Sequence, residues 1–257
     1  METKNYRIGE TKIMNNGMKA TIIHYEKATN IDIKFEDGTI VKNKRYSSFK
    51  TGNILNPNLI SLCDIGYIGQ GKYHTTKDNK LTKEYQVWSD MIKRCCSNKF
   101  IKKYPSYKDC TVCEEWHNFQ NFAEWYNENY YEADNENMCL DKDILVKGNK
   151  VYSPETCIFV PQFINNLFPK CDSARGKHLI GVTTKQDSNK YFANCSINNK
   201  LKKKRIYLGA FETELEAFET YKQFKENYIK QIADEYKDKI PKKLYNAMYN
   251  YKVEITD

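Results

Sequence analysis

Hydrophobic and polar positions alternate with period two in the first part of the chain, which predicts short strands separated by turns. The expected strands are residues 19–25, 31–35 and 39–41. An Asp37-Gly38 pair between the last two is typical of a hairpin turn. We expect residues 1–58 to form a small N-terminal β-barrel. Glycines among polar residues then predict a flexible linker over 59–82.

From Lys83 the apolar positions recur every three or four residues, which predicts helices from Lys83 and over 115–130. Their apolar stripes are Tyr85, Trp88, Met91, Ile92 and Cys95, then Trp116, Phe119, Phe122, Ala123 and Tyr126. We interpret both stripes as core rather than as ligand-binding surfaces. A strand over 138–145, a second over 157–160 and a helix from Pro161 then complete a ββα unit, so 83–170 is the expected central domain.

The pattern of residues 171–257 predicts a last domain with three strands followed by a long helix. The expected strands are 179–184, 191–197 and 205–208. Thr213 with Glu216 three residues later predicts a capping box at the start of the helix, and Pro241 predicts a short terminal helix. The fold class is therefore α+β.

Period-two alternation sorts the three C-terminal strands into two faces. The apolar face is expected to pack on the helix through Ala217, Phe218, Tyr221 and Phe224. The other face carries Thr183, Lys185, Phe192, Asn194, Ser196, Lys203, Arg205 and Tyr207. Strands with such a face can enter a major groove, where Arg and Asn have bidentate partners on guanine and adenine. The lysines at 202–204 are expected to contact phosphates.

Charge is concentrated in the same part of the chain. Residues 170–209 hold ten Lys or Arg against Asp172 and Asp187, whereas 112–143 hold nine Asp or Glu against Lys142 alone. The basic stretch indicates a phosphate-facing surface, with a solvated run of charge as the alternative. The net charge is +8 and the mean hydropathy −0.78, without a long apolar run or a secretion leader, so we expect a cytoplasmic protein.

The C-terminal residues resemble a known DNA-binding domain. The shared pattern is Gly181-Val182, Tyr191-x-Ala193, Leu208-Gly209-x-Phe211-x-Thr213, Glu216-Ala217 and Tyr221. It is similar to the Apetala/ethylene-response-factor domain in its phage form, over roughly sixty residues. The resemblance implies that the outward strand residues face double-stranded DNA, and a fold kept for protein contact is the alternative.

The central residues resemble phage-encoded HNH-type proteins over about eighty residues. The shared pattern is Tyr85-x-x-Trp88-x-x-Met91-Ile92-x-Arg94-Cys95, Val112-Cys113-x-x-Trp116-x-x-Phe119-x-x-Phe122, Leu140-Asp141-Lys142-Asp143 and Tyr152-Ser153-Pro154-Glu155-Thr156-Cys157. In active members a ββα (His-Me finger-like) hairpin holds one divalent metal, and a histidine deprotonates the attacking water. The resemblance therefore implies a metal-dependent DNA endonuclease using Mg²⁺ or Mn²⁺.

Carried over by position, Asp141 is the expected metal ligand on the first strand, and Asn165 or Asn166 the ligand on the helix. Lys142 stands where the general-base histidine belongs, and the central asparagine of the motif falls on Tyr152. A protonated lysine is a poor base, and nearby carboxylates keep it protonated.

Other residues remain candidates for the base. Asp143 and Glu155 lie close to the motif, and His117 lies on the preceding helix, where an ordinary half-buried histidine is the better interpretation. The hypotheses left open are an active nickase with an altered base, a slow nuclease, and an inactive hairpin that only holds DNA.

Cysteines offer a separate metal hypothesis. Cys110 and Cys113 have zinc-ligand spacing and could be joined by Cys95, Cys96 and Cys157. A lone pair at this spacing is weak evidence, so packed thiols are the preferred interpretation and zinc the lesser one.

The N-terminal part also holds basic and aromatic residues. Those that could add phosphate contacts or stack a base are Lys42, Lys44, Arg45, Tyr46, Phe49 and Lys50, with a solvated lysine edge as the alternative. From these patterns and the two resemblances we expect a phage DNA-binding protein of the homing-endonuclease type. The rival is a catalytically inactive regulator or anti-defence protein that binds DNA or a host protein.

Overall fold

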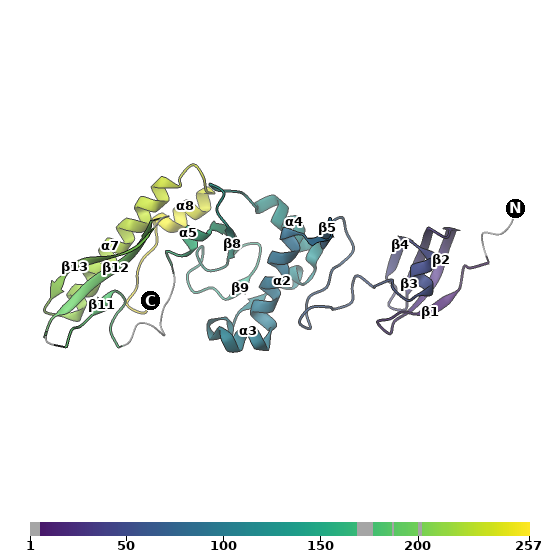
Figure 1. Cartoon of the computed structure of the whole chain (residues 1–257), viewed down its shortest axis with the longest axis horizontal. Coiled ribbons are helices and arrows are strands. Elements are labelled where there is room, and N and C mark those ends of the chain that lie inside the picture. Colours follow the sequence, from purple (N-terminus) through teal and green to yellow (C-terminus); the bar gives the residue numbers. More distant parts are fainter. Residues whose placement is uncertain (1–5, 169–176, 187, 200–201) are drawn as a thin grey trace. The chain divides into compact units, whose positions relative to one another are not determined.

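The computed structural model describes residues 6–168, 177–186, 188–199 and 202–257; the side chains of 198–199 and 202–203 are not among the described parts. Helices and antiparallel sheets are mixed along the chain, as the α+β prediction requires (Figure 1). Two compact units are present, Met1–Trp125 and Tyr126–Asp257. No helix among the described residues is both long enough and apolar enough to cross a membrane.

The N-terminal part is an open sheet, so the predicted barrel was wrong. Its antiparallel strands, in spatial order, are β1 (Thr11–Ile13), β2 (Lys19–Lys27), β3 (Asn30–Phe35) and β4 (Ile40–Lys44). Within the described chain β1 and β4 form its two edges. A barrel requires its edges to pair. Here the apolar face is instead covered by α1 (Tyr46–Lys50), whose Phe49 is buried together with Ile54.

This packing also bears on the hypothesis of base stacking in the N-terminal part. Phe49 is fully buried in the core with Ile22 and Ile33. Tyr46 is half-buried, its hydroxyl lies 3.0 Å from a carboxylate oxygen of Glu10, and its ring centroid lies 4.0 Å from the Arg7 guanidinium. The buried Phe49 ring is not presented to a base, so that hypothesis was wrong for Phe49 and stays a prediction for Tyr46.

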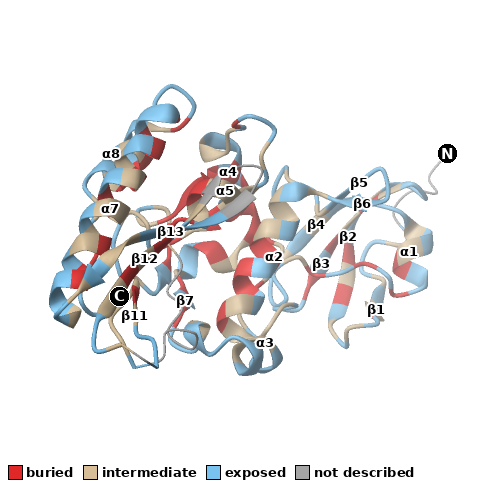
Figure 2. Ribbon diagram, turned by 60° about the vertical axis from the view of Figure 1, so that its left-hand side comes forward, coloured by how far each residue is buried: buried red, intermediate tan, exposed pale blue. Residues whose placement is uncertain are grey.

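The chain from the N-terminal sheet to residue 129 is mainly helical, and its last helix crosses the division between the two units. Its elements are β5 (Thr76–Lys77), β6 (Lys80–Leu81), α2 (Lys83–Cys96), α3 (Asn98–Lys103), the 3₁₀ helix η1 (Pro105–Tyr107), β7 (Thr111–Val112), the 3₁₀ helix η2 (Glu114–His117) and α4 (Phe119–Asn129). Both predicted apolar stripes contribute to the core, which confirms their interpretation (Figure 2). Helix α4 is shorter than the predicted 115–130. Asn118 just before it is extended, and its side-chain oxygen accepts a hydrogen bond from the backbone N–H of Gln120 at 2.9 Å.

The glycines of the predicted linker lie against side chains of the first unit. A Cβ atom on Gly66 would lie 3.1 Å from the ring of Trp88, and one on Gly69 would lie 2.0 Å from Oδ1 of Asn118. The side-chain amide of Gln120 donates to the backbone carbonyl groups of Ile68 and Tyr73 at 3.3 and 3.0 Å. Close approach, rather than flexibility, explains these glycines.

The second unit begins with the predicted ββα arrangement. Strands β8 (Met138–Asp141) and β10 (Ile158–Pro161) are antiparallel, with Asp141 opposite Ile158, and α5 (Gln162–Asn165) contacts both. Both strands are shorter than or shifted from the predicted ranges, and β9 (Val151–Tyr152) lies in the loop between them. The loop therefore begins directly after Asp141.

The C-terminal sheet follows the predicted order. Its strands are β11 (Val182–Thr183), β12 (Tyr191–Asn199) and β13 (Lys202–Phe211), all antiparallel, and α7 (Glu214–Glu235) packs on them. The capping box is present: the Thr213 hydroxyl accepts from the Glu216 amide at 3.3 Å, and the Glu216 carboxylate accepts from the Thr213 amide at 3.1 Å. Gly181, with φ +79°, lies so close to Tyr221 that a Cβ would meet the ring at 2.1 Å.

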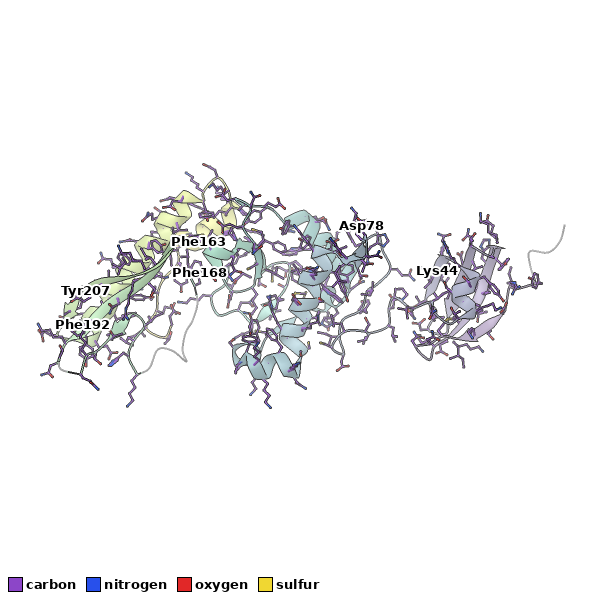
Figure 3. The ribbon with its side chains drawn as sticks, viewed as in Figure 1. Lys44, Asp78, Phe163, Phe168, Phe192 and Tyr207 are labelled. Atoms are coloured by element: carbon purple, nitrogen blue, oxygen red, sulfur yellow. The ribbon has the colours of Figure 1, made fainter. Side chains whose placement is uncertain are left out.

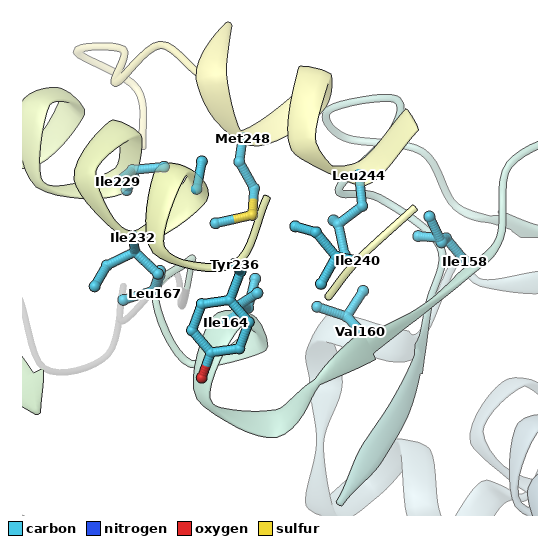
Figure 4. Close-up of a cluster of buried hydrophobic side chains, with 11 residues drawn as sticks. Ile158, Val160, Ile164, Leu167, Ile229, Ile232, Tyr236, Ile240, Leu244 and Met248 are labelled. Carbon is cyan, nitrogen blue, oxygen red and sulfur yellow. The ribbon is translucent and has the colours of Figure 1, made fainter. Parts of the chain in front are cut away.

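One hydrophobic cluster joins the ββα elements to the C-terminal helices. It combines residues of β10 and α5 with the end of α7 and with α8 (Lys242–Tyr249), the helix predicted after Pro241. The cluster, drawn in Figure 4, is Ile158, Val160, Ile164, Leu167, Ile229, Ile232, Ala233, Tyr236, Ile240, Leu244 and Met248. The predicted division at 170/171 remains a prediction, but these segments share a core.

Candidate nucleic-acid interface and ββα site

The outer face of the C-terminal sheet is exposed, whereas the inner face packs on α7. Across β12 and β13, Ser196 pairs with Arg205 and Asn194 with Tyr207. The intervening Cys195 is buried among α7 side chains. Of the predicted DNA-binding residues, Lys185, Ser196, Arg205 and Tyr207 are exposed, Thr183 and Asn194 are half-buried, and the Lys203 side chain lies outside the described residues.

A bulge interrupts the sheet without disturbing the outer face. Ala193 pairs with Gly209 and Asn194 with Tyr207, so Leu208 is the extra residue on β13. Leu208 packs against the inner core, as predicted. Gly209 has φ +143°, a backbone conformation that side chains disfavour, which explains the glycine at this point.

Two of the predicted base readers are tied to one another. The Asn194 amide nitrogen lies 3.2 Å from the Thr183 hydroxyl and 3.1 Å from the Phe192 carbonyl oxygen, and it donates to both. These bonds compete with any bond from that amide to a base. Arg205 and Ser196, which pair across the strands and are exposed, are better placed as readers.

Aromatic rings form a second feature of this face. The ring centroids of Phe192 and Tyr207 lie 6.4 Å apart at an angle of 38°. Both rings lie on the outer part of the C-terminal sheet (Figure 3). The Lys185 ammonium lies 4.5 Å from the Phe192 centroid. Alternation alone predicted Phe192 on this face, but not its position beside Tyr207.

Asp141 lies at the end of β8, at the start of the loop between β8 and β10. Its Oδ1 accepts hydrogen bonds from the backbone N–H groups of Asp143 and Ile144, at 2.9 and 2.7 Å. Burial and the nearby Asp143 carboxylate raise the pKa of Asp141 to about 6, against the opposite effect of the two N–H groups. A carboxyl group with this pKa exchanges protons near neutral pH.

Lys142 is arranged as a charged ammonium. Its side chain is only 9% exposed, its Nζ lies 3.2 Å from Oδ2 of Asp143, and it lies 5.8 Å from the centroid of the Tyr152 ring. A carboxylate and an aromatic face both stabilise a cation. An ammonium has no lone pair with which to accept a proton, so this geometry favours a binding role over a base.

The remaining candidates separate by their contacts. The side-chain oxygen of Asn166 accepts a hydrogen bond from the side-chain amide of Gln162 at 3.0 Å. Asn165 is therefore the better candidate for the metal ligand on the helix. Glu155 is exposed, and a hydrogen bond from Ser153 lowers its pKa, which makes it a weak base. The His117 ring lies 3.2 Å from the Val112 carbonyl oxygen, as expected for an ordinary half-buried histidine.

The donor types fit a hard cation better than zinc. Among the described residues no group of three His, Cys, Asp or Glu side chains is placed to hold a metal. Mg²⁺ keeps several waters and needs only one or two protein oxygen ligands. Oδ2 of Asp141 and the amide oxygen of Asn165 are donors of that kind, so the Mg²⁺ or Mn²⁺ prediction fits in residue type. Of the cysteines in the zinc hypothesis, Cys95, Cys110 and Cys157 are buried, and Cys96 and Cys113 are half-buried.

Comparison of the chain with protein-family models, with curated proteins and with solved structures found no match.

Proposed function

We propose that the protein binds double-stranded DNA through the outer face of the sheet formed by β11, β12 and β13. The observation that carries this proposal is the exposure of Lys185 and Arg205 on the outer face of a sheet whose reverse side is packed on α7. Exposed cations on one rigid face attract a polyanion, and the packed helix holds the strands in place when they meet it.

The side chains on this face divide into two roles. Arg205 has the planar fork that matches the major-groove edge of guanine, and the neighbouring Ser196 hydroxyl can bond to any base. Lys185 contributes charge to phosphates, which positions the sheet without reading sequence. Lys203 is expected to act in the same way.

Replacement of Arg205 by alanine tests the proposal. We expect Kd for duplex DNA to rise about 5- to 100-fold, and the slope of log K against log salt to become shallower by about one. Fluorescence anisotropy over a salt series measures both quantities. Lys99→Ala, which removes an exposed charge from the first unit, is the matched control. Equal effects of the two substitutions would exclude the C-terminal sheet from the interface.

A second candidate function is metal-dependent nicking of the bound DNA, of the kind that the HNH resemblance implies. It is favoured by Asp141, which combines a raised pKa with a second carboxylate oxygen beyond the one held by the loop N–H groups. Asp141 and Asn165 would hold the cation, which when bound supplies positive charge to the phosphate and the leaving oxygen. Asp143 would orient Lys142 toward a phosphate.

The rival is a non-catalytic protein that binds DNA or a host protein with the same scaffold, and the ion-paired Lys142 favours it. Incubation of supercoiled plasmid with the protein and Mg²⁺ or Mn²⁺ separates the two. Nicking that disappears in Asp141→Ala would support catalysis. Intact plasmid at every metal concentration, together with DNA binding, would leave the non-catalytic function.

A further inference from the structure

An aromatic pair lies on the outer face of the C-terminal sheet. Tyr207 is 61% exposed, although it belongs to a ten-residue strand, and Phe192 on the next strand is half-exposed. Their rings lie 6.4 Å apart on the same side of the sheet. The opposite side already has a core that includes Ala193, Cys195 and Phe218, so packing within the unit does not require these rings on the outer side.

The surroundings of the aromatic pair are basic. Lys185 lies over the Phe192 ring at 4.5 Å, and Arg205 precedes Tyr207 by two positions, on the same face. Lys190 interacts electrostatically with Tyr207 and is paired with the Glu212 carboxylate at 2.9 Å. The rings are therefore offered to a ligand that is both planar and anionic, which is the chemistry of a nucleotide.

We propose that Tyr207, supported by Phe192, stacks on an unpaired base, so that the preferred ligand is duplex DNA with an extrahelical or bulged base. The inference rests on the proposed DNA binding and names the form of DNA that the face selects. In a perfect duplex both faces of each base are covered by its neighbours, and a ring in the groove meets only base edges. An unpaired base offers its face, and stacking with a ring stabilises the complex.

The test compares two duplexes of one sequence, with and without a single unpaired central base. Anisotropy titrations use the full chain and the variants Tyr207→Leu, Tyr207→Phe and Arg205→Ala. Leucine keeps the bulk of the side chain but not the ring, whereas phenylalanine keeps the ring. Tyr249→Leu, which alters an exposed tyrosine on α8, is the matched control.

We expect the bulged duplex to bind about 5- to 100-fold more tightly than the perfect one, the range that one base–ring stack supplies. Tyr207→Leu should remove the preference, and Tyr207→Phe and Tyr249→Leu should retain it. Arg205→Ala should weaken binding to both duplexes and leave the ratio of the two Kd values unchanged. Equal affinity of the unaltered protein for both duplexes would overturn the stacking role and leave DNA binding standing. Absence of binding to either duplex would overturn both proposals.

Discussion

Single residues in the ββα unit show how local geometry changes the chemistry expected from a motif. Asp141 is half-buried, and its Oδ1 is fixed by two loop N–H groups, so the carboxylate has a defined orientation but loses solvation. Lys142, one position later, is held by Asp143 as a charged group. The sequence shows which residue types stand here, whereas burial and pairing, seen only in the structure, raise the pKa of Asp141 and place Lys142 beside a carboxylate.

Asp141 should make stability depend on pH. Its pKa is raised from 3.8 to about 6, so the folded chain binds this proton more tightly than the unfolded chain. The free energy of unfolding should therefore fall by about 2–3 kcal/mol from this group as the pH rises from 4 to 7. Asp141→Asn keeps an oxygen acceptor for the loop and should remove that fall, as measured by urea unfolding at each pH.

Asp238→Asn provides the control for this substitution, because Asp238 is an exposed aspartate of the same unit. It should retain the pH dependence of the unaltered chain. If Asp141→Asn retained it as well, the burial of Asp141 would have no energetic consequence.

At the scale of elements, local signals predicted α7 and α8 well. Thr213 and Glu216 fix the start of α7 by satisfying N–H groups within four residues of chain, and Pro241 begins α8. The strands were less predictable: β10 and β8 share a register that depends on partners many residues apart. Signals that act within one turn are visible in a sequence, whereas pairing between distant segments is not.

Removal of the α7 cap should destabilise the second unit. Thr213→Ala leaves the Glu216 amide without its side-chain acceptor and should lower the free energy of unfolding by about 1 kcal/mol. Chemical denaturation measures the change. Thr220→Ala is the matched control, since Thr220 is half-buried on the same helix and its hydroxyl donates to the Glu216 carbonyl at 3.0 Å, away from the cap. If the control lowered the free energy of unfolding as much, the effect would come from the loss of a threonine and not from the loss of the cap.

At the scale of the whole molecule, the second unit is held together by a core built from segments about 80 residues apart. Val160 and Ile164 of the ββα elements pack with Ile232 of α7 and with Leu244 and Met248 of α8. The ββα elements and the candidate DNA-binding sheet therefore pack on the same helix, α7, through two separate clusters.

Leu244→Ala should loosen the ββα strands as well as α8. The substitution leaves a cavity in the shared cluster and should cost about 2–5 kcal/mol of stability. Amide hydrogen exchange should rise in β10, although β10 precedes Leu244 by more than eighty residues. Asn246→Ala, at an exposed position of α8, is the control. Faster exchange confined to α8 would show that the two segments are energetically independent.

Alternation and helical periodicity by themselves determined α2, most of α4, the outward face of the C-terminal sheet and the core stripes, because each depends on neighbours within one or two turns. Only the tertiary structure decided that the N-terminal sheet stays open and that glycines 66 and 69 pack against Trp88 and Asn118. It also decided that Lys142 forms an ion pair with Asp143 and that Phe192 lies beside Tyr207. Each of these outcomes depends on which distant residue comes to lie beside a given side chain, and spacing along the chain does not contain that information.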